Sequence, residues 1–491
     1  MSGTKRPHEA MDIVTPCEVT ASVAAPAEST DDPSVAAIGA PTPTEVTPTP
    51  THVDGRSAKG QGKGKRGGPD KRRGGAREPW GRPATDGTTE PRENSEPRQP
   101  KRKVALLMSF CGTDYQGMQI NDNARTIEGE LFQGLVKAGA VSQANADSYK
   151  KISLGRAART DKGVHAAGQV VSCKIIVEDP DIVAKINAAL PPAIRVWNYA
   201  RVVGSFDPRK ACDSRIYEYL LPTHVFLPPR PKPDPMPDLT AAAAAGERGL
   251  RSTSVQMAER RAYRIPPETL ERVRVALHRY EGSHNFHNFT IAKKFHDMSA
   301  RRFIKSFTAS DPFVRDGTEW LSLKVHGQSF MMHQIRKMVG LVILIVRADL
   351  PETEIFAQAV REPKLNLPKA PSLGLLLERV VFDSYNRKVQ ATATQKGGED
   401  ERPPIVFDPY QSDIDAFRES FIYSQIIATE KAEDVFDSWL LHFEAFPEYF
   451  PFLASGGKVL DQDCVVRDSA PLPADQGEHE NELAVGDDDA A

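Results

Sequence analysis

Residues 155–172 read GRAARTDKGVHAAGQVVS, a pattern that predicts a tight turn leading directly into a buried strand. Asp161 can accept hydrogen bonds from nearby amides and Gly163 tolerates a positive φ, so the residues alone favour a structural turn. Two features favour a functional loop instead. Arg156 and Arg159 lie close to the carboxylate in the sequence, where they would hold it ionised and would also bind phosphate. The apolar strand that follows would fix the loop at a sheet edge, from which a side chain can project into a cleft.

Alternating strand and helix patterns extend on both sides of this turn. The ordered part is expected to begin near residue 101. Thr126 is predicted to cap a helix, because Ile127, Leu131 and Leu135 follow it at helical spacing. Since strand, helix and strands recur twice in this order, we predict a duplicated α+β unit. The predicted strands are 104–110, 168–177, 194–203, 215–221, 301–309, 319–327 and 374–382, and the further predicted helices are 179–190, 266–282 and 329–346.

The net charge of −3 conceals strongly charged segments within the 491 residues. Residues 56–77 hold nine Lys or Arg and one Asp, whereas 461–491 hold ten Asp or Glu and one Arg. Such segments are too polar to bury a core. The expected organisation begins with a disordered basic and acidic arm (1–100), an N-terminal α+β half that contains the turn at Asp161 (101–205) and a C-terminal α+β half (206–387) with a disordered insertion (228–260). A linker (388–404), a helical C-terminal extension (405–460) and a disordered acidic tail (461–491) follow. The extension's aromatic residues are expected to pack on the main body: Phe417, Phe421, Phe436, Trp439 and Phe443.

The composition disfavours several classes of protein. The five Cys are scattered without a CxxC pair, which is typical of free thiols in a reducing compartment. No run of about 18 apolar residues predicts a membrane helix, and the first residues lack the apolar core of a signal peptide. The basic runs 56–77 and 100–103 fit nuclear import signals, and equally a solvated linker that binds polyanions loosely. On the first interpretation the protein is expected in the nucleus.

The stretch ARTDKGVHAAGQVVS resembles the signature loop of TruA-type tRNA pseudouridine synthases, and within them the eukaryotic Pus1-like branch, especially its fungal members. Further segments resemble the family's motifs in the family's order, and the resemblance covers about residues 101–387. They are FCGTDYQG (110–117), FDPR (206–209) with SRIYEY (214–219), YEGSHNF (280–286), SFMMHQIRKMVG (329–340) and APSLGL (370–375). The resemblance implies an α+β fold with two ferredoxin-like halves joined through a continuous antiparallel sheet around a basic RNA-binding cleft, plus C-terminal helices.

The resemblance also implies roles for individual side chains. Asp161 would be the catalytic carboxylate, and Arg159 would help to extrude the target nucleotide and contact its backbone. Tyr217 would stack on the uracil, and Arg336 would pair with Asp161. Leu375 would line the uracil pocket.

Two of these side chains allow simpler interpretations on the residues alone. Tyr217 lies on an alternating strand, where an aromatic residue usually belongs to the core. Arg336 lies in an otherwise apolar helix, so it either pairs with a carboxylate such as Asp161 or reaches water from the helix surface. The chain also departs from the family beside Tyr217, where Ile216 replaces a frequent Arg and Arg215 stands one position earlier.

Weaker candidates for RNA contact lie near the turn and in a basic segment around residues 293–305. For that segment, an ordinary solvated face is the alternative. His284, His287 and His296 lack Cys or paired carboxylates at ligand spacing, so no metal site is predicted. The weaker candidates are Arg156, Lys162, His165, Lys293, Lys294, Arg301 and Arg302.

The implied reaction breaks the N1–C1′ bond of a uridine and joins C5 to C1′, which oxidises nothing, so no cofactor is expected. A carboxylate can form a covalent intermediate, and a uridine in a stem must be flipped out before a side chain reaches it. The expected partners are tRNA, at the anticodon stem-loop region, and also U2-type snRNA and mRNA, with no membrane contact and a monomeric protein. Two alternatives stay open: a Pus3-like synthase with a different target position, and a catalytically inactive RNA-binding or RNA-folding protein on the same fold.

Overall fold

The computed structural model describes residues 99–121, 123–230, 251–291, 293–396 and 402–445. The chain divides into two compact units after Glu90, and every described residue belongs to the second unit, Pro91–Ala491. Nearly all of the predicted arm, residues 231–250 of the predicted insertion, residues 446–460 of the predicted extension and the whole predicted tail lie outside the described residues.

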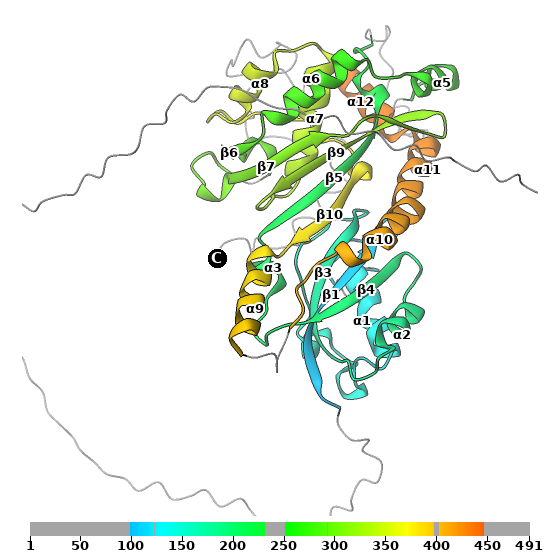
Figure 1. Ribbon diagram of the computed structural model, residues 1–491. Helices are drawn as coiled ribbons and strands as arrows, with labels where there is room; N and C mark the ends of the chain where they lie inside the picture. Colours follow the sequence, from blue (N-terminus) through cyan, green and yellow to red (C-terminus); the bar gives the residue numbers. More distant parts are fainter. Residues whose placement is uncertain (1–98, 122, 231–250, 292, 397–401, 446–491) are drawn as a thin grey trace, which may run out of the picture. The chain divides into compact units, whose positions relative to one another are not determined.

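A ten-stranded sheet forms the centre of the second unit (Figure 1). The strands are β1 (Lys101–Phe110), β2 (Gly155–Arg156), β3 (His165–Ile176), β4 (Ile194–Arg201), β5 (Ser214–Pro222), β6 (Gly282–Asn285), β7 (Arg301–Ala309), β8 (Phe313–Arg315), β9 (Thr318–Gly327) and β10 (Leu375–Val381). Their order is β4-β1-β3-β10-β5-β9-β7-β6, with β2 paired to β3 and β8 paired to β9. Each predicted strand is present, which confirms the α+β class.

The first helix begins where the sequence predicts it. The Thr126 side chain accepts a hydrogen bond from the Gly129 amide at 3.3 Å, and Ile127, Leu131 and Leu135 are buried on one face. The other elements are helices, most of which contribute side chains to the core. They are α1 (Ile127–Lys137), α2 (Ile182–Ala189), α3 (Pro208–Ala211), α5 (Ser254–Ala262), α6 (Pro267–His278), α7 (Gln334–Arg347), α8 (Glu352–Ala359) and α9 (Asp383–Lys396), and then the C-terminal α10 (Gln411–Phe417), π-helix η8 (Arg418–Tyr423), α11 (Ser424–Glu433) and α12 (Val435–Ala445).

Two predicted segments are wrong in part, because each contains a helix. Helix α5 occupies the end of the predicted insertion, where Thr253 and Gln256 cap each other's backbone amides and Arg260 pairs with the buried Asp437 of α12 at 3.1 Å. Helix α9 continues to Lys396, so the predicted linker starting at residue 388 is helical over its first part. The partner that stabilises α5 comes from the far end of the chain, which a local pattern cannot reveal.

The two halves of the sheet meet at β3 and β10. Strand β10 pairs with β5 in the antiparallel sense and with β3 in the parallel sense, through Leu376 opposite His165 and Leu377 opposite Ala166. The halves are thus joined in one sheet as predicted, but the joint is parallel, whereas all other described strand pairs are antiparallel. Gly168 is required here, because a Cβ would lie 2.7 Å from the Glu378 carbonyl oxygen. As parallel neighbours, β3 and β10 both begin at the same edge of the sheet.

The C-terminal helices cross this joint and contact both halves of the sheet (Figure 1). On the first half, the ring of Phe417 meets that of Trp197 of β4 edge to face, with centroids 6.0 Å apart. At the joint, Arg418 pairs with Glu378 of β10 at 2.9 Å. Because the parallel joint itself is only two residue pairs long, these contacts add substantially to the connection between the halves.

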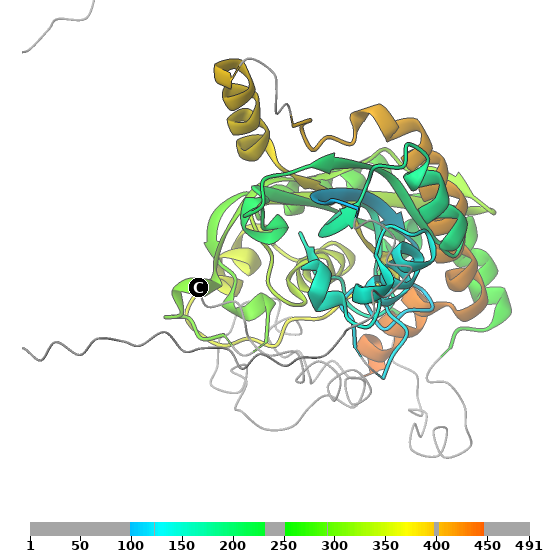
Figure 2. The same ribbon diagram turned by 90° about the horizontal axis from the view of Figure 1, so that it is seen from below.

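The same helices cover the face of the sheet opposite to the one that carries Tyr217. Tyr423 donates a hydrogen bond to the buried Glu218, and successive side chains of a strand point to opposite faces. Figure 2 shows these helices, in orange, along one side of the sheet. The predicted packing of the aromatic residues is confirmed for four of them: Phe417 and Phe436 are buried, and Trp439 and Phe443 are partly buried. Phe421 is more exposed, and its ring stacks on that of Phe417 with centroids 4.8 Å apart.

Candidate active site

Asp161 lies in the turn between β2 and β3, at the edge of the sheet where the joint begins. Its carbonyl oxygen accepts a hydrogen bond from the Val164 amide at 3.1 Å, which closes a four-residue turn, and Gly163 adopts φ 74 at the third position. The Gly163 amide donates to the Tyr115 carbonyl at 3.2 Å, which fixes the turn to the segment after β1. The Asp161 side chain is exposed. The segment is therefore a well-formed turn that also presents a carboxylate to solvent.

Arg156 holds the start of this loop from inside the protein. Its guanidinium pairs with Glu128 of α1 at 2.8 Å, and Glu128 is completely buried. Burial raises the pKa of the Glu128 carboxyl, and the neighbouring Arg156 charge acts in the opposite direction. Glu128 also accepts a hydrogen bond from the Ile120 amide at 3.1 Å. Arg156, a weaker candidate for RNA contact, therefore has a structural partner, and 17% of its side chain stays exposed.

The next two residues of the loop are held by side chains from two different strands. Gln169 of β3 donates to the Ala158 carbonyl at 2.8 Å and accepts from its amide at 3.3 Å. Arg215 of β5 donates to the Ala157 carbonyl at 3.0 Å. Together with the Arg156 ion pair, these contacts fix three consecutive residues, so the loop that carries Asp161 is held in one geometry.

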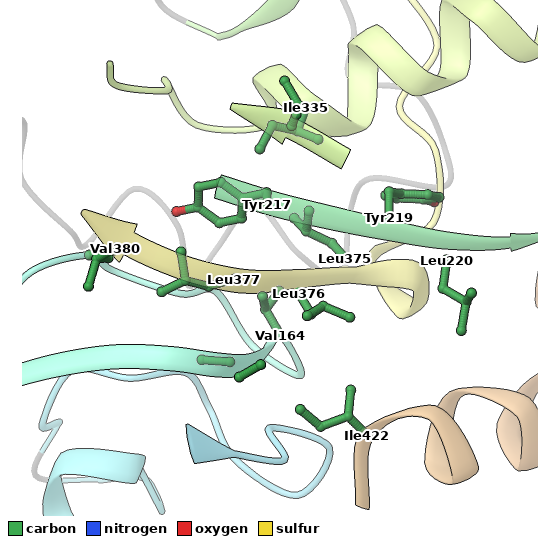
Figure 3. Close-up of a cluster of buried hydrophobic side chains, with 14 of the residues drawn as sticks. Val164, Tyr217, Tyr219, Leu220, Ile335, Leu375, Leu376, Leu377, Val380 and Ile422 are labelled. Carbon is green, nitrogen blue, oxygen red and sulfur yellow. The ribbon is translucent and has the colours of Figure 1, made fainter. Parts of the chain in front are cut away.

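Tyr217 and Leu375, the predicted uracil contacts, lie together at the joint. Tyr217 of β5 is 9% exposed, and its ring meets Phe330 edge to face with centroids 5.3 Å apart. Figure 3 shows Tyr217, Leu375 and Ile335 of α7 on one side of β10, with Leu376 on the other. Burial raises the pKa of Tyr217 to about 12; Arg215 acts against this shift and Asp161 adds to it. Tyr217 is therefore a neutral phenol near neutral pH, within electrostatic range of Asp161.

Arg336 lies near the N-terminus of α7, and its side chain is directed inward rather than to the surface. It is 6% exposed, and its Nε donates to the Ala370 carbonyl at 2.7 Å. The Ala370 amide returns a hydrogen bond to the Arg336 carbonyl at 3.1 Å. These two bonds fix the segment that leads into β10. Arg336 therefore does not reach water from the helix surface. Its direct pairing with Asp161 stays a prediction.

His333 is a site residue that the sequence interpretation missed. It precedes α7 with φ 62, a left-handed conformation that is rare for residues other than glycine, and it is 6% exposed. The pKa of His333 is lowered to about 4, mainly by burial and also by the Lys369 and Arg336 charges, while the Asp161 charge opposes the shift. Asp161, His333 and Arg336 therefore belong to one electrostatic cluster. The helix predicted to start at residue 329 begins at residue 334 instead. A polar residue just before an apolar helix is the sequence signal that could have identified His333.

The remaining predicted RNA contacts separate into two places. Arg159 and Lys162 are exposed on either side of Asp161, as expected for residues that meet a phosphate backbone. The candidates of the basic segment lie in or just before β7. Strand β7 is the third strand from β10 in the sheet, which places it about 14 Å away. Among these, Lys293 pairs with Asp297 at 3.4 Å, Arg302 donates to the Arg301 carbonyl at 2.9 Å, and Lys294 and Arg301 are exposed.

The predicted RNA contact of His165 is wrong, because this side chain is buried. His165 is 1% exposed as the first residue of β3, and its Nδ1 accepts a hydrogen bond from the Gly112 amide at 3.1 Å. Both faces of β3 are covered near its start, because its first nine residues are all buried, so a side chain on either face lies inside the protein. Burial lowers the pKa of His165 to about 4.

This buried histidine predicts a pH dependence of stability. The folded pKa of about 4 lies below the usual 6.5, so the unfolded chain binds the proton first as the pH falls. Stability is therefore lost between pH 6.5 and 4, by about 2 kcal/mol for this group between pH 7 and 5. In His165→Asn, which keeps an acceptor and cannot titrate, denaturant unfolding should show a loss smaller by about that amount. Equal pH slopes for the two proteins would contradict the assignment.

The three histidines considered for a metal site have separate surroundings. His284 Nε2 contacts the Glu281 carbonyl oxygen at 2.8 Å, His296 contacts Glu362 at 3.1 Å, and His287 is buried. Over the described ranges, no group of three His, Cys, Asp or Glu side chains is placed to hold a metal ion. In the same ranges, no helix is long and apolar enough to cross a membrane.

Comparison with known proteins identifies the family to which this arrangement belongs. Residues 276–383 match the family model described as tRNA pseudouridine synthase. The tRNA pseudouridine synthase 1 of Yarrowia lipolytica is 42% identical over 468 residues, which cover 84% of this chain and 87% of that protein. That of Saccharomyces cerevisiae is 40% identical, covering 72% of this chain and 73% of the relative. The mouse pseudouridylate synthase 1 homolog is 42% identical, covering 71% and 75%.

The similarity to these relatives extends well beyond the residues matched by the family model, because it covers 71% to 84% of this chain. The sheet and its helices also agree with the fold that the resemblance implies, in which two α+β halves share one sheet. The chain therefore belongs to the TruA-type family of tRNA pseudouridine synthases and is an isomerase.

Proposed function

We propose that this enzyme isomerises specific uridines in the anticodon stem-loop region of tRNA, with Asp161 as the catalytic carboxylate. The observation that carries the proposal is the placement of an exposed Asp161 side chain on a fixed turn, in electrostatic range of the buried Tyr217 and His333. A carboxylate held next to neutral aromatic groups suits an attack on, or a proton transfer from, a base stacked between them.

The chemistry assigns a separate task to each neighbouring side chain. The N1–C1′ bond breaks, the uracil turns, C5 bonds to C1′, the C5 proton leaves and N1 gains a proton, so atoms and charge balance. Asp161 supplies the nucleophile or the base for these steps. A neutral Tyr217 stacks on the uracil face, and Leu375 closes the apolar side of the pocket. Arg336 holds the Asp161 carboxylate ionised and oriented.

Access to the uridine requires that it leave the helical stack, which costs a few kcal/mol. Arg159 is exposed next to the carboxylate, where its planar guanidinium can fill the vacated position and bind the adjacent phosphate. Stacking on Tyr217 offsets a further part of that cost. These side chains would contact only the flipped uridine and its phosphate, which other RNAs also contain, so U2-type snRNA and mRNA are further proposed substrates. The basic runs 56–77 and 100–103 support a nuclear enzyme, which we propose acts as a monomer.

Tritium release separates this proposal from an RNA-binding protein that has lost activity. The purified enzyme is mixed with unmodified tRNA that carries tritium at C5 of its uridines, and released tritium is counted. An active synthase must release the C5 label, because C5 becomes bonded to C1′. The matched control carries tritium at C6, which the reaction retains. Tight tRNA binding without release of the C5 label would favour the inactive alternative.

A further inference from the structure

We propose that Arg215 is a positioning residue that couples the second half of the fold to the catalytic loop. The inference rests on the proposed role of Asp161, whose loop it would hold. Arg215 stands one position before Ile216, where the chain departs from the family pattern, and the resemblance assigns Arg215 no role. Its contacts supply one.

The Arg215 guanidinium joins three segments of backbone. It donates to the Ala157 carbonyl of the catalytic loop at 3.0 Å and to the Gln328 carbonyl after β9 at 3.0 Å. A longer hydrogen bond of 3.4 Å reaches the Arg209 carbonyl of α3. A guanidinium can donate to several acceptors at once, because its five N–H groups lie in one rigid plane and point in different directions. A lysine ammonium is a compact point donor on a flexible stem, so it cannot reproduce this arrangement.

Arg215 is distinct from the other two side chains that hold the loop. Glu128 of α1 and Gln169 of β3 belong to the same half as the loop, so they fix it only within that half. Arg215 belongs to β5, on the other side of the joint. The parallel joint is only two residue pairs long. A side chain that forms hydrogen bonds across it therefore helps to fix the position of one half relative to the other.

The Gln328 contact extends the connection to the proposed uracil platform. Gln328 stands two residues before Phe330, and the Phe330 ring packs on Tyr217. Arg215 is itself two residues from Tyr217 on β5, and its charge acts on the pKa of that phenol. One guanidinium thus links the loop that carries the carboxylate with the strand and loop that place the stacking ring. Its loss should misplace the carboxylate relative to the base without removing a substrate contact.

The test compares Arg215→Lys and Arg215→Met with the unaltered enzyme. Lys keeps the charge and Met keeps most of the stem, so neither variant removes the side chain's packing entirely. Amide hydrogen exchange in residues 157–164 should become at least about tenfold faster in both variants. The single-turnover rate at saturating tRNA should fall at least about 30-fold, while the Kd for tRNA stays within about threefold.

Arg264→Met is the matched control. Arg264 also donates to three backbone carbonyls, those of Arg261 at 3.0 Å, Tyr263 at 2.7 Å and Gly317 at 3.2 Å, on the outer side of the second half. Its loss should leave loop exchange and the single-turnover rate unchanged. Thermal unfolding of all three variants shows whether they are folded. If Arg215→Met is unfolded, the milder Arg215→Lys is used for the test.

Each outcome decides between positioning and another role. Faster loop exchange with a lower rate and unchanged tRNA affinity supports the proposal. A lower rate with unchanged exchange, or a Kd raised more than about tenfold, would assign Arg215 to direct RNA contact and overturn it. Faster exchange with an unchanged rate would overturn it as well. The exchange measurement does not depend on Asp161 being catalytic, so failure of that assignment would be recognised separately, by substitution of Asp161 itself.

Discussion

Arg336→Met is expected to slow pseudouridine formation at least about 100-fold, equivalent to about 2.7 kcal/mol of transition-state stabilisation. Affinity for tRNA should stay within about threefold, because Arg336 is buried and offers no surface to the RNA backbone. Two losses account for the expected fall in rate. The Ala370 carbonyl loses its Nε donor, which loosens the segment before β10, and the cluster of Asp161 and His333 loses its cationic member. The rate is measured in single turnover at saturating tRNA.

Arg347→Met is the matched control in the same helix. Arg347 is also buried, donates to the Val225 carbonyl at 3.3 Å and pairs with Glu444 of α12. Removing one partner of a buried ion pair costs about 3–5 kcal/mol. Arg347→Met should therefore lose stability and yet keep its rate. If the two variants lost activity in proportion to stability, the specific role of Arg336 would be refuted.

Local sequence patterns predict most of the elements of this fold, because their causes are local. The Thr126 cap and the buried face of α1 lie within one stretch of ten residues, and β3 and β5 show their apolar runs directly. The parallel pairing of β3 with β10 could not be predicted, because those strands lie about 200 residues apart and either direction satisfies their apolar pattern. Helix α5 was missed for a similar reason, since its Arg260 is paired by Asp437 of the C-terminal extension.

The candidate site shows the same limit at the level of side chains. The motif around Asp161 locates the turn, and resemblance adds Tyr217, Arg336 and Leu375. Which way each side chain points depends on strand register and on the neighbouring segments. His165 looks like a basic residue near a functional loop, but it is buried because both faces of β3 are covered. Arg156 likewise looks free in the sequence, although Glu128 lies beside it in the fold. The left-handed φ of His333 leaves no trace in the sequence.

Asp161→Asn is expected to have the largest effect of any single substitution, at least about a 1,000-fold loss of pseudouridine formation, or about 4 kcal/mol. Asparagine suits the turn as well as aspartate does, and Asp161 is an exposed residue, so the protein should stay folded even though the proposed pair with Arg336 is lost. Affinity for tRNA should stay within about tenfold, or 1.4 kcal/mol. The substitution removes the nucleophile and the negative charge and leaves the backbone turn intact.

Asp316→Asn provides the matched control for this substitution. Asp316 is also a turn residue with an exposed carboxylate, in the hairpin between β8 and β9, and it pairs with Lys431 at 3.1 Å across the surface. Its replacement should leave both the rate and tRNA binding unchanged. A shared loss of activity in the two variants would indicate a general effect of charge on RNA binding instead of catalysis at Asp161.

The most direct test is the amount of pseudouridine formed in unmodified tRNA by folded Asp161→Asn protein. Each protein is incubated in excess over the tRNA, the RNA is digested to nucleosides, and pseudouridine is quantified after chromatographic separation from uridine. We expect full conversion at the target position by the unaltered enzyme and by Asp316→Asn, and none above background by Asp161→Asn, although all three bind the tRNA. Formation of pseudouridine by Asp161→Asn at a rate near that of the unaltered enzyme would contradict the assignment of Asp161 as the catalytic carboxylate.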